Sequence, residues 1–266
     1  MGKKIIFCSC GSERINQEKL ESIEKILIDT NIDLIKISDL CGVSVKNRET
    51  LKGIFPGTNE YLIIACHSRT IRLLLDKAGI DIKEGSFKFI NFFESDIEEI
   101  KRETVSFKNR VDTHVKASFE EISSYPGWIS WYPIIDYTRC TSCGQCADFC
   151  LFGVYDKSDG KINVVNPEGC KINCPACARI CPQTAIIFPK YISGGAIGGS
   201  DVIDEISEQK RQAEDINTLL NSDIYSALEK RKQKRRSIIR EEAMNKAIEE
   251  KFNALNNNNM SIGNHE

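Results

Sequence analysis

Two short, cysteine-rich segments constrain the fold of this chain more than any other feature of the sequence. The first is CTSCGQCADFC, and the second is CKINCPACARICP. The cysteines of the first segment are Cys140, Cys143, Cys146 and Cys150, and those of the second are Cys170, Cys174, Cys177 and Cys181. Eight thiols at paired spacings are difficult to explain as buried packing residues or as a zinc site, so they indicate ligands of iron–sulfur clusters.

Composition supports a metal-binding interpretation of the cysteines. The 266 residues include 12 cysteines but only 3 histidines, His67, His114 and His265. The start of the chain turns polar before a signal-peptide core is complete, and we therefore expect a cytoplasmic protein in which thiols stay reduced. No apolar run is long enough to predict membrane insertion, and the net charge of −2 gives no reason to expect nucleic-acid binding.

The spacing of the first segment predicts how the eight cysteines divide between two clusters. Gaps of two, two and three residues are the run found in bacterial ferredoxins, where the fourth cysteine binds the other cluster. The crossing rule predicts one 4Fe-4S cluster on Cys140, Cys143, Cys146 and Cys181. It predicts a second on Cys150, Cys170, Cys174 and Cys177.

Residues 130–190 resemble the dicluster ferredoxin family, which implies an α+β domain with two clusters. The sequence departs from that family at two points. Leu151 stands where proline is usual, and the gap between Cys170 and Cys174 is one residue longer. Four thiolates remain available in each set, so we expect the longer gap to change one loop and its hydrogen bonds to sulfur.

The first 95 residues alternate apolar strands with amphipathic helices. Strands are predicted at residues 3–8, 32–37, 61–66 and 87–92. One predicted helix carries Leu20, Ile23 and Leu27 on one face, and another ends at Gly79. This alternation predicts a small α/β domain with a parallel sheet and helices on both faces. We also expect residues 96–124 to be helical.

Four further cysteines follow the predicted strands, and they are Cys8, Cys10, Cys41 and Cys66. The carboxyl ends of parallel strands meet at one edge of a sheet, so these thiols could converge, although buried cysteine packing is also common. The stretches CSCG and ACHSRTIRLLLDKAGI resemble the amino-terminal domain of the flavin-containing iron–sulfur subunit in heterodisulfide reductases, a family of anaerobic metabolism. That resemblance implies a third 4Fe-4S cluster on the four cysteines. The alternative is a Cys8–Cys10 redox pair or persulfide carrier, its charge tuned by His67 and Arg69.

The remainder of the chain contains joints and helices. Pro126, Gly127 and Pro133 mark a break, and SGGAIGGSD at 193–201 predicts a flexible joint. Residues after 201 predict a helical extension that could dock a partner, followed by a disordered tail. KRKQKRR at 230–236 is interpreted as a solvated helix face. We therefore expect an α/β domain at 1–125, a dicluster domain at 126–193 and an extension at 194–266.

Trp128, Trp131 and Tyr132 precede the first cysteine segment, and core packing is the simpler explanation for them. No GxGxxG turn follows a strand, so no flavin is expected. The sequence as a whole predicts an electron-transfer protein or oxidoreductase subunit that relays single electrons between redox partners. A redox enzyme or sulfur carrier using the amino-terminal cysteines is the alternative. A regulatory or scaffold role for the helical tail is a third hypothesis.

Overall fold

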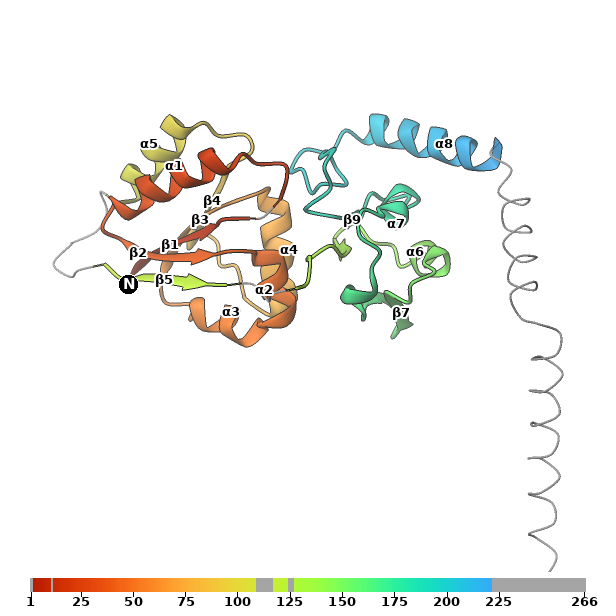
Figure 1. Cartoon of the computed structure of the whole chain (residues 1–266). Helices are drawn as coiled ribbons and strands as arrows, with labels where there is room; N and C mark the ends of the chain where they lie inside the picture. The colour runs from red at the N-terminus through yellow and green to blue at the C-terminus, as the bar shows by residue number, and fades with distance from the viewer. Residues whose placement is uncertain (1, 11, 109–116, 124–126, 222–266) are drawn as a thin grey trace, which may run out of the picture. The chain divides into compact units, whose positions relative to one another are not determined.

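The computed structural model describes the chain except for residues 1, 11, 109–116, 124–126 and 222–266 (Figure 1). The chain divides into two compact units, Met1–Gln212 and Ala213–Glu266. The first unit contains an α/β part, residues 2–122, and a cysteine-rich part, residues 127–200. In the second unit the structure describes only the end of the last helix.

A five-stranded parallel sheet forms the centre of the α/β part. Its strand order is β4-β3-β1-β2-β5. The strands are β1 (Lys3–Cys8), β2 (Asp33–Ile37), β3 (Glu60–Ala65), β4 (Phe87–Asn91) and β5 (Phe119–Ile122). Ile6 in the central strand pairs with Ile35 on one side and Ile63 on the other. All three side chains are buried, because a parallel sheet covered on both faces needs apolar strands.

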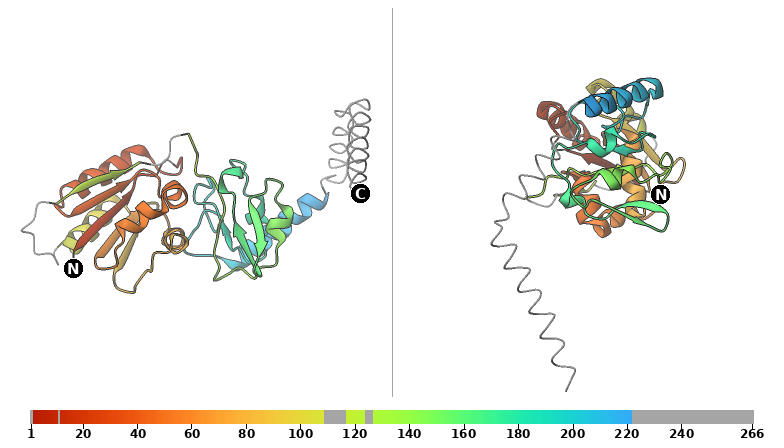
Figure 2. Two further views of the ribbon diagram at one scale, coloured as in Figure 1. Left: turned by 90° about the horizontal axis from the view of Figure 1, so that it is seen from below. Right: turned by 90° about the vertical axis from the view of Figure 1, so that its right-hand side faces the viewer.

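Helices cover both faces of this sheet (Figures 1 and 2). Helices α1 (Gln17–Ile28) and α5 (Ile97–Lys108) lie on one face. On the other lie α2 (Leu40–Lys46), α3 (Arg48–Ile54) and α4 (Ser68–Ala78). Leu20, Ile23 and Leu27 are buried on α1 as their spacing predicts, and α4 ends at Gly79 in the left-handed conformation. The prediction of an α/β fold with a parallel sheet is confirmed.

The prediction that residues 96–124 are helical is wrong over part of that range. Helix α5 ends at Lys108, and residues 119–122 form β5, which pairs in parallel with β2. This edge strand has the sequence FEEI, and its first three residues are exposed. An edge strand needs little apolar surface, so its sequence lacks the alternation that identifies a half-buried strand.

The cysteine-rich part is built from short elements. Strands β6 (Ile134–Ile135) and β9 (Ile186–Ile187) pair antiparallel, as do β7 (Tyr155–Ser158) and β8 (Lys161–Val164). Two short helices, α6 (Gln145–Phe149) and α7 (Ala176–Arg179), each carry one cysteine, Cys146 and Cys177. A turn of 3₁₀ helix at Pro167–Gly169 precedes Cys170. Trp131 and Tyr132 are buried, as predicted. The ring of Trp131 stacks on that of Phe188, with 5.1 Å between the ring centroids.

The glycine-rich segment at 193–201 is packed, which differs from the flexible joint that its composition predicts. Residues 196–199 are buried. Gly199 has φ +91°, and a Cβ there would lie 2.0 Å from Thr70 Oγ1 on α4. The glycines therefore permit a close approach of the loop to α4 rather than flexibility.

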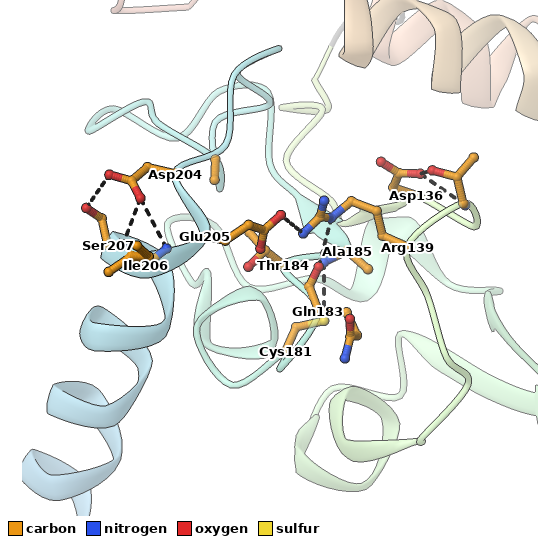
Figure 3. Close-up of polar contacts among 12 residues, drawn as sticks. Asp136, Arg139, Cys181, Gln183, Thr184, Ala185, Asp204, Glu205, Ile206 and Ser207 are labelled. Carbon is orange, nitrogen blue, oxygen red and sulfur yellow. Dashed lines mark hydrogen bonds and ion pairs between the residues drawn. The ribbon is translucent and has the colours of Figure 1, made fainter.

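Polar contacts fix both ends of this loop. Asp201 accepts hydrogen bonds from the backbone N–H groups of Ser68 and Arg69 at the start of α4. The side chain of Asp204 accepts bonds from the N–H groups of Ile206 and Ser207 at the start of α8 (Glu205–Asn221), and Arg139 binds Glu205 at 2.7 Å (Figure 3). A helix follows residue 201, as predicted. The predicted docking stripe beyond residue 222, the basic run at 230–236 and the tail lie outside the described residues.

Candidate iron–sulfur sites

The first cysteine group consists of Cys140, Cys143, Cys146 and Cys181, and these side chains line one small cavity that is partly open to solvent. Apolar side chains close its other sides, and they include Ile135, Ile162 and Ile186. Burial, together with the neighbouring Cys181, Cys140 and Cys143, raises the pKa of the Cys146 thiol to about 11. The four thiols predicted to share a cluster are therefore neighbours.

Backbone N–H groups point at two of these sulfurs. Ser142 N donates to Cys140 Sγ at 3.4 Å. Ala185 N donates to Cys181 Sγ at 3.4 Å (Figure 3). Such bonds stabilise negative charge on sulfur, and a cluster with four thiolate ligands needs this stabilisation. Gly144, at φ +84°, allows the turn that brings Cys143 and Cys146 to the same cavity.

The loop before Cys140 is held by Asp136, whose carbonyl accepts the Cys140 N–H at 2.9 Å. Burial of Asp136 would raise the pKa of its carboxyl, but hydrogen bonds from Thr138 and Arg69 lower it overall. Arg69 lies on α4, and its Nε is 2.9 Å from Asp136 Oδ2 while its Nη2 donates to Thr184 O. This arginine connects the α/β part to the cysteine-rich part, close to both ends of the first cysteine group.

The second cysteine group consists of Cys150, Cys170, Cys174 and Cys177. Burial, together with neighbours that include Cys170 and Cys150, raises the pKa of the Cys177 thiol to about 12. Burial also raises the pKa of Cys170 to about 11, with contributions from Cys174 and Cys150. The structure thus brings these four thiols into mutual electrostatic range. The hydroxyl of Tyr155 donates to Cys177 Sγ at 3.0 Å.

Both groups fit the chemistry of a 4Fe-4S cluster better than that of a single ion. Among the described residues, no three His, Cys, Asp or Glu side chains lie close enough together to bind one metal ion. Each thiolate of a 4Fe-4S cluster binds a different iron, so its ligands surround a larger volume. The high thiol pKa values mean that binding of iron must displace protons.

The amino-terminal cysteine group consists of Cys8, Cys10, Cys41 and Cys66, at the carboxyl ends of β1, β2 and β3. The connections out of β1 and β3 run in opposite directions at this edge, the usual position of ligand sites in open α/β sheets. The thiols of Cys8 and Cys10 share a hydrogen bond, which raises the pKa of Cys8 and lowers that of Cys10. Burial, together with the neighbouring Cys10, raises the pKa of Cys66 to about 12.

Three charged residues lie near this group, and they are Lys190, Asp39 and Arg14. Nothing in the sequence around the cysteines identifies them. Lys190 lowers the pKa of Cys10, and its Nζ lies 2.7 Å from Asp39 Oδ2. Asp39 raises the pKa of Cys41 after the larger effect of burial, and the pKa of Arg14 is lowered chiefly by burial and raised in part by Cys66. Lys190 is distant in sequence from the cysteines, so only the tertiary fold identifies it. Arg69, expected to tune the thiolates, binds Asp136 instead.

His67 is buried beside this group. Its ring contacts Arg14, whose Nη2 lies 3.2 Å from His67 Nε2. Burial, assisted by the charge of Arg14, lowers the pKa of His67, so the ring is neutral near pH 7.

Comparison with known proteins agrees with the geometry of the cysteine-rich part. The sequence model of the 4Fe-4S binding domain matches residues 133–153. Uncharacterized ferredoxin MJ0251 of Methanocaldococcus jannaschii is 43% identical over 84 residues, which are 31% of this chain and 57% of that protein. Ferredoxin-3 of Nostoc sp. is 34% identical over 79 residues, 21% of this chain and 80% of that protein. Uncharacterized ferredoxin MJ0722 of M. jannaschii is 38% identical over 58 residues, 21% of this chain and 74% of that protein.

The matched domain and its cysteines define the class: this is an iron–sulfur protein of the 4Fe-4S type. Given its similarity to most of the length of two of these relatives, the chain belongs to the ferredoxin family. It spans 57% of the length of the first relative. In the part of the chain that the structure describes, no helix is long and apolar enough to cross a membrane.

Proposed function

We propose that this ferredoxin relays single electrons through two 4Fe-4S clusters, one bound by the first cysteine group and one by the second. The observation that carries the proposal is the position of Cys181, which lines the same cavity as Cys140, Cys143 and Cys146 although it belongs to the other segment. A crossed arrangement of this kind is typical of two-cluster ferredoxins. The cysteine-rich part would hold the clusters near each other and exclude water from most of their surface.

A third 4Fe-4S cluster on the amino-terminal cysteine group is part of the proposal. Its support is the convergence of Cys8, Cys10, Cys41 and Cys66 at the ligand-binding edge of the sheet, together with the resemblance to heterodisulfide reductases. A specific observation favours a second candidate, a dithiol or persulfide centre reduced by the clusters. The pKa of Cys10 is lowered by its bond with Cys8 and by Lys190, as expected for a reactive thiolate.

The proposed setting is that of an electron-transfer component of a cytoplasmic oxidoreductase complex in anaerobic metabolism. Its partners would be redox proteins or oxidoreductase subunits, with neither nucleic acid nor flavin bound by this chain. The proposed domains are residues 1–125, 126–193 and 194–266, with the last available to dock a partner.

Two double variants test the crossed ligand sets. In Cys140→Ala with Cys181→Ala, both changes fall on one proposed cluster, so iron content should drop by about four atoms per chain. In Cys170→Ala with Cys181→Ala, the changes fall on both proposed clusters, and the drop should be about eight. The opposite result, about eight for the first pair and about four for the second, would show that each segment binds its own cluster.

Alkylation separates the two candidates for the amino-terminal group. Iodoacetamide is added to the anaerobically purified protein, and modified residues are located by mass spectrometry. Cluster ligands should be protected, whereas a free dithiol centre should be alkylated at Cys10 first, because its thiol has the lowered pKa. Alkylation of Cys10 in protein that contains about eight irons per chain would exclude the third cluster.

A further inference from the structure

Tyr155 contacts a sulfur of the second cysteine group directly. It lies at the start of β7, and its side chain is partly buried against the core that contains Cys177. Its hydroxyl donates to Cys177 Sγ at 3.0 Å. A hydroxyl of this kind can donate one hydrogen bond, and here it donates that bond to sulfur.

The two cysteine groups differ at this point. Tyr155 follows Cys150 by five positions, and the residue that follows Cys181 by five positions is Ile186. Ile186 lines the cavity of the first cysteine group with a side chain that carries no hydrogen-bond donor. The bonds to sulfur in the first group come from backbone N–H groups, those of Ser142 and Ala185. A side-chain hydroxyl therefore distinguishes the second group from the first at equivalent positions.

A hydrogen bond to a ligand sulfur affects the two redox states of a cluster unequally. One-electron reduction adds negative charge that spreads over the cluster and its thiolates, and a donor at sulfur stabilises the more negative state more strongly. No proton needs to move, because the hydroxyl keeps its hydrogen in both states. Burial and the neighbouring Cys177 raise the pKa of Tyr155, so the hydroxyl stays protonated over the working pH range.

We propose that Tyr155 sets the redox potential of the second cluster, making it higher than it would be without the hydroxyl and thereby helping to direct the electron to that cluster. The inference rests on the proposed function, in which Cys177 is a cluster ligand. Tyr155 acts through Cys177 and is a positioning and tuning residue; the electron passes between the clusters and their partners.

The test is an anaerobic redox titration of the full chain followed by EPR, with Tyr155→Phe as the variant. Phenylalanine keeps the ring and removes only the hydroxyl. The midpoint potential of the second cluster should become more negative, while that of the first cluster and the iron content stay as in wild type. Tyr137→Phe is the matched control: Tyr137 donates to the backbone carbonyl of Ile162 at 2.9 Å, so the second cluster should keep its potential.

Two outcomes separate this inference from the proposed function. An unchanged second-cluster potential in Tyr155→Phe with full iron content would overturn the tuning role and leave the cluster assignment intact. Absence of a second cluster in wild-type protein would overturn the proposed function itself. If Tyr155→Phe fails to retain its clusters, 3-fluorotyrosine at position 155 provides the second measurement. Its more acidic hydroxyl is a stronger donor and should raise the potential; no rise would contradict the proposal.

Discussion

His67 illustrates how a single residue couples this fold to pH. Its side chain is only 5% exposed, and it lies against Arg14, Asn91 and Phe93. Burial is the main cause of its lowered pKa, and the charge of Arg14 acts in the same direction. In the unfolded chain the imidazole titrates near its ordinary value of 6.5. Below that pH the unfolded state therefore binds a proton at this ring more tightly than the folded state does.

His67 should make the stability of the folded protein depend on pH. Because the folded pKa of His67 is depressed, protonation stabilises the unfolded state as the pH falls through 6.5. Between pH 7.5 and 5.5 the free energy of unfolding of the wild type should fall more than that of His67→Gln. Thermal unfolding of the iron-loaded protein, scanned at several pH values under anaerobic conditions, measures the difference. Equal pH dependence in the two proteins would show that His67 is not the group responsible.

At the scale of elements, the sequence predicts β1 to β4, α1 and α4 because each carries a regular apolar pattern or a clear end signal. Gly79 ends α4, and Leu20, Ile23 and Leu27 mark the buried face of α1. It misses β5, an exposed edge strand, and α2 and α3, which are seven residues each and too short to show a helical period. The glycine-rich loop is misread because composition cannot distinguish a flexible joint from a close approach to α4.

The candidate sites, too, could be predicted only in part from the sequence: their cysteines could be identified, but the residues around the sulfurs could not. The crossed division of the eight cysteines is a prediction from their spacing, because ferredoxin runs have this arrangement. The structure brings thiols of each predicted set near one another. Lys190, Asp39, Arg14 and Tyr155 could not be identified, because their positions relative to sulfur depend on contacts between segments distant in sequence.

The close packing of the glycine-rich loop on α4 predicts that two glycine substitutions will differ in their cost to stability. Gly199→Ala adds a Cβ that would meet Thr70 Oγ1 and also forces alanine into a positive φ, so it should cost about 3 kcal/mol. Gly195→Ala is the matched control: φ there is +61° but nothing lies within 4 Å of the added Cβ, so the cost should be about 1 kcal/mol. Thermal unfolding midpoints of the iron-loaded variants measure both. Equal losses would mean that the loop does not pack closely on α4.

At the scale of the whole molecule, hydrogen bonds link the α/β part to the cysteine-rich part. These bonds lie near the amino-terminal cysteine group and near the first cysteine group. Arg69, three residues after Cys66, binds Asp136, which holds the loop before Cys140. Tyr132, which follows the break in the chain, donates from its hydroxyl to Cys41 O at 2.8 Å. Such contacts fix the amino-terminal cysteine group relative to the first cysteine group, which the proposed relay of single electrons would require.

The most direct test of the account is the iron and acid-labile sulfide content of the anaerobically purified chain. We expect about twelve irons per chain in the wild type, and about eight in a variant with Cys8, Cys10, Cys41 and Cys66 all replaced by alanine. About eight in both proteins would remove the third cluster and leave the two ferredoxin clusters in place. The central claim, two 4Fe-4S clusters in the cysteine-rich part, predicts that the variant retains about eight irons; a variant with about four or fewer would contradict it.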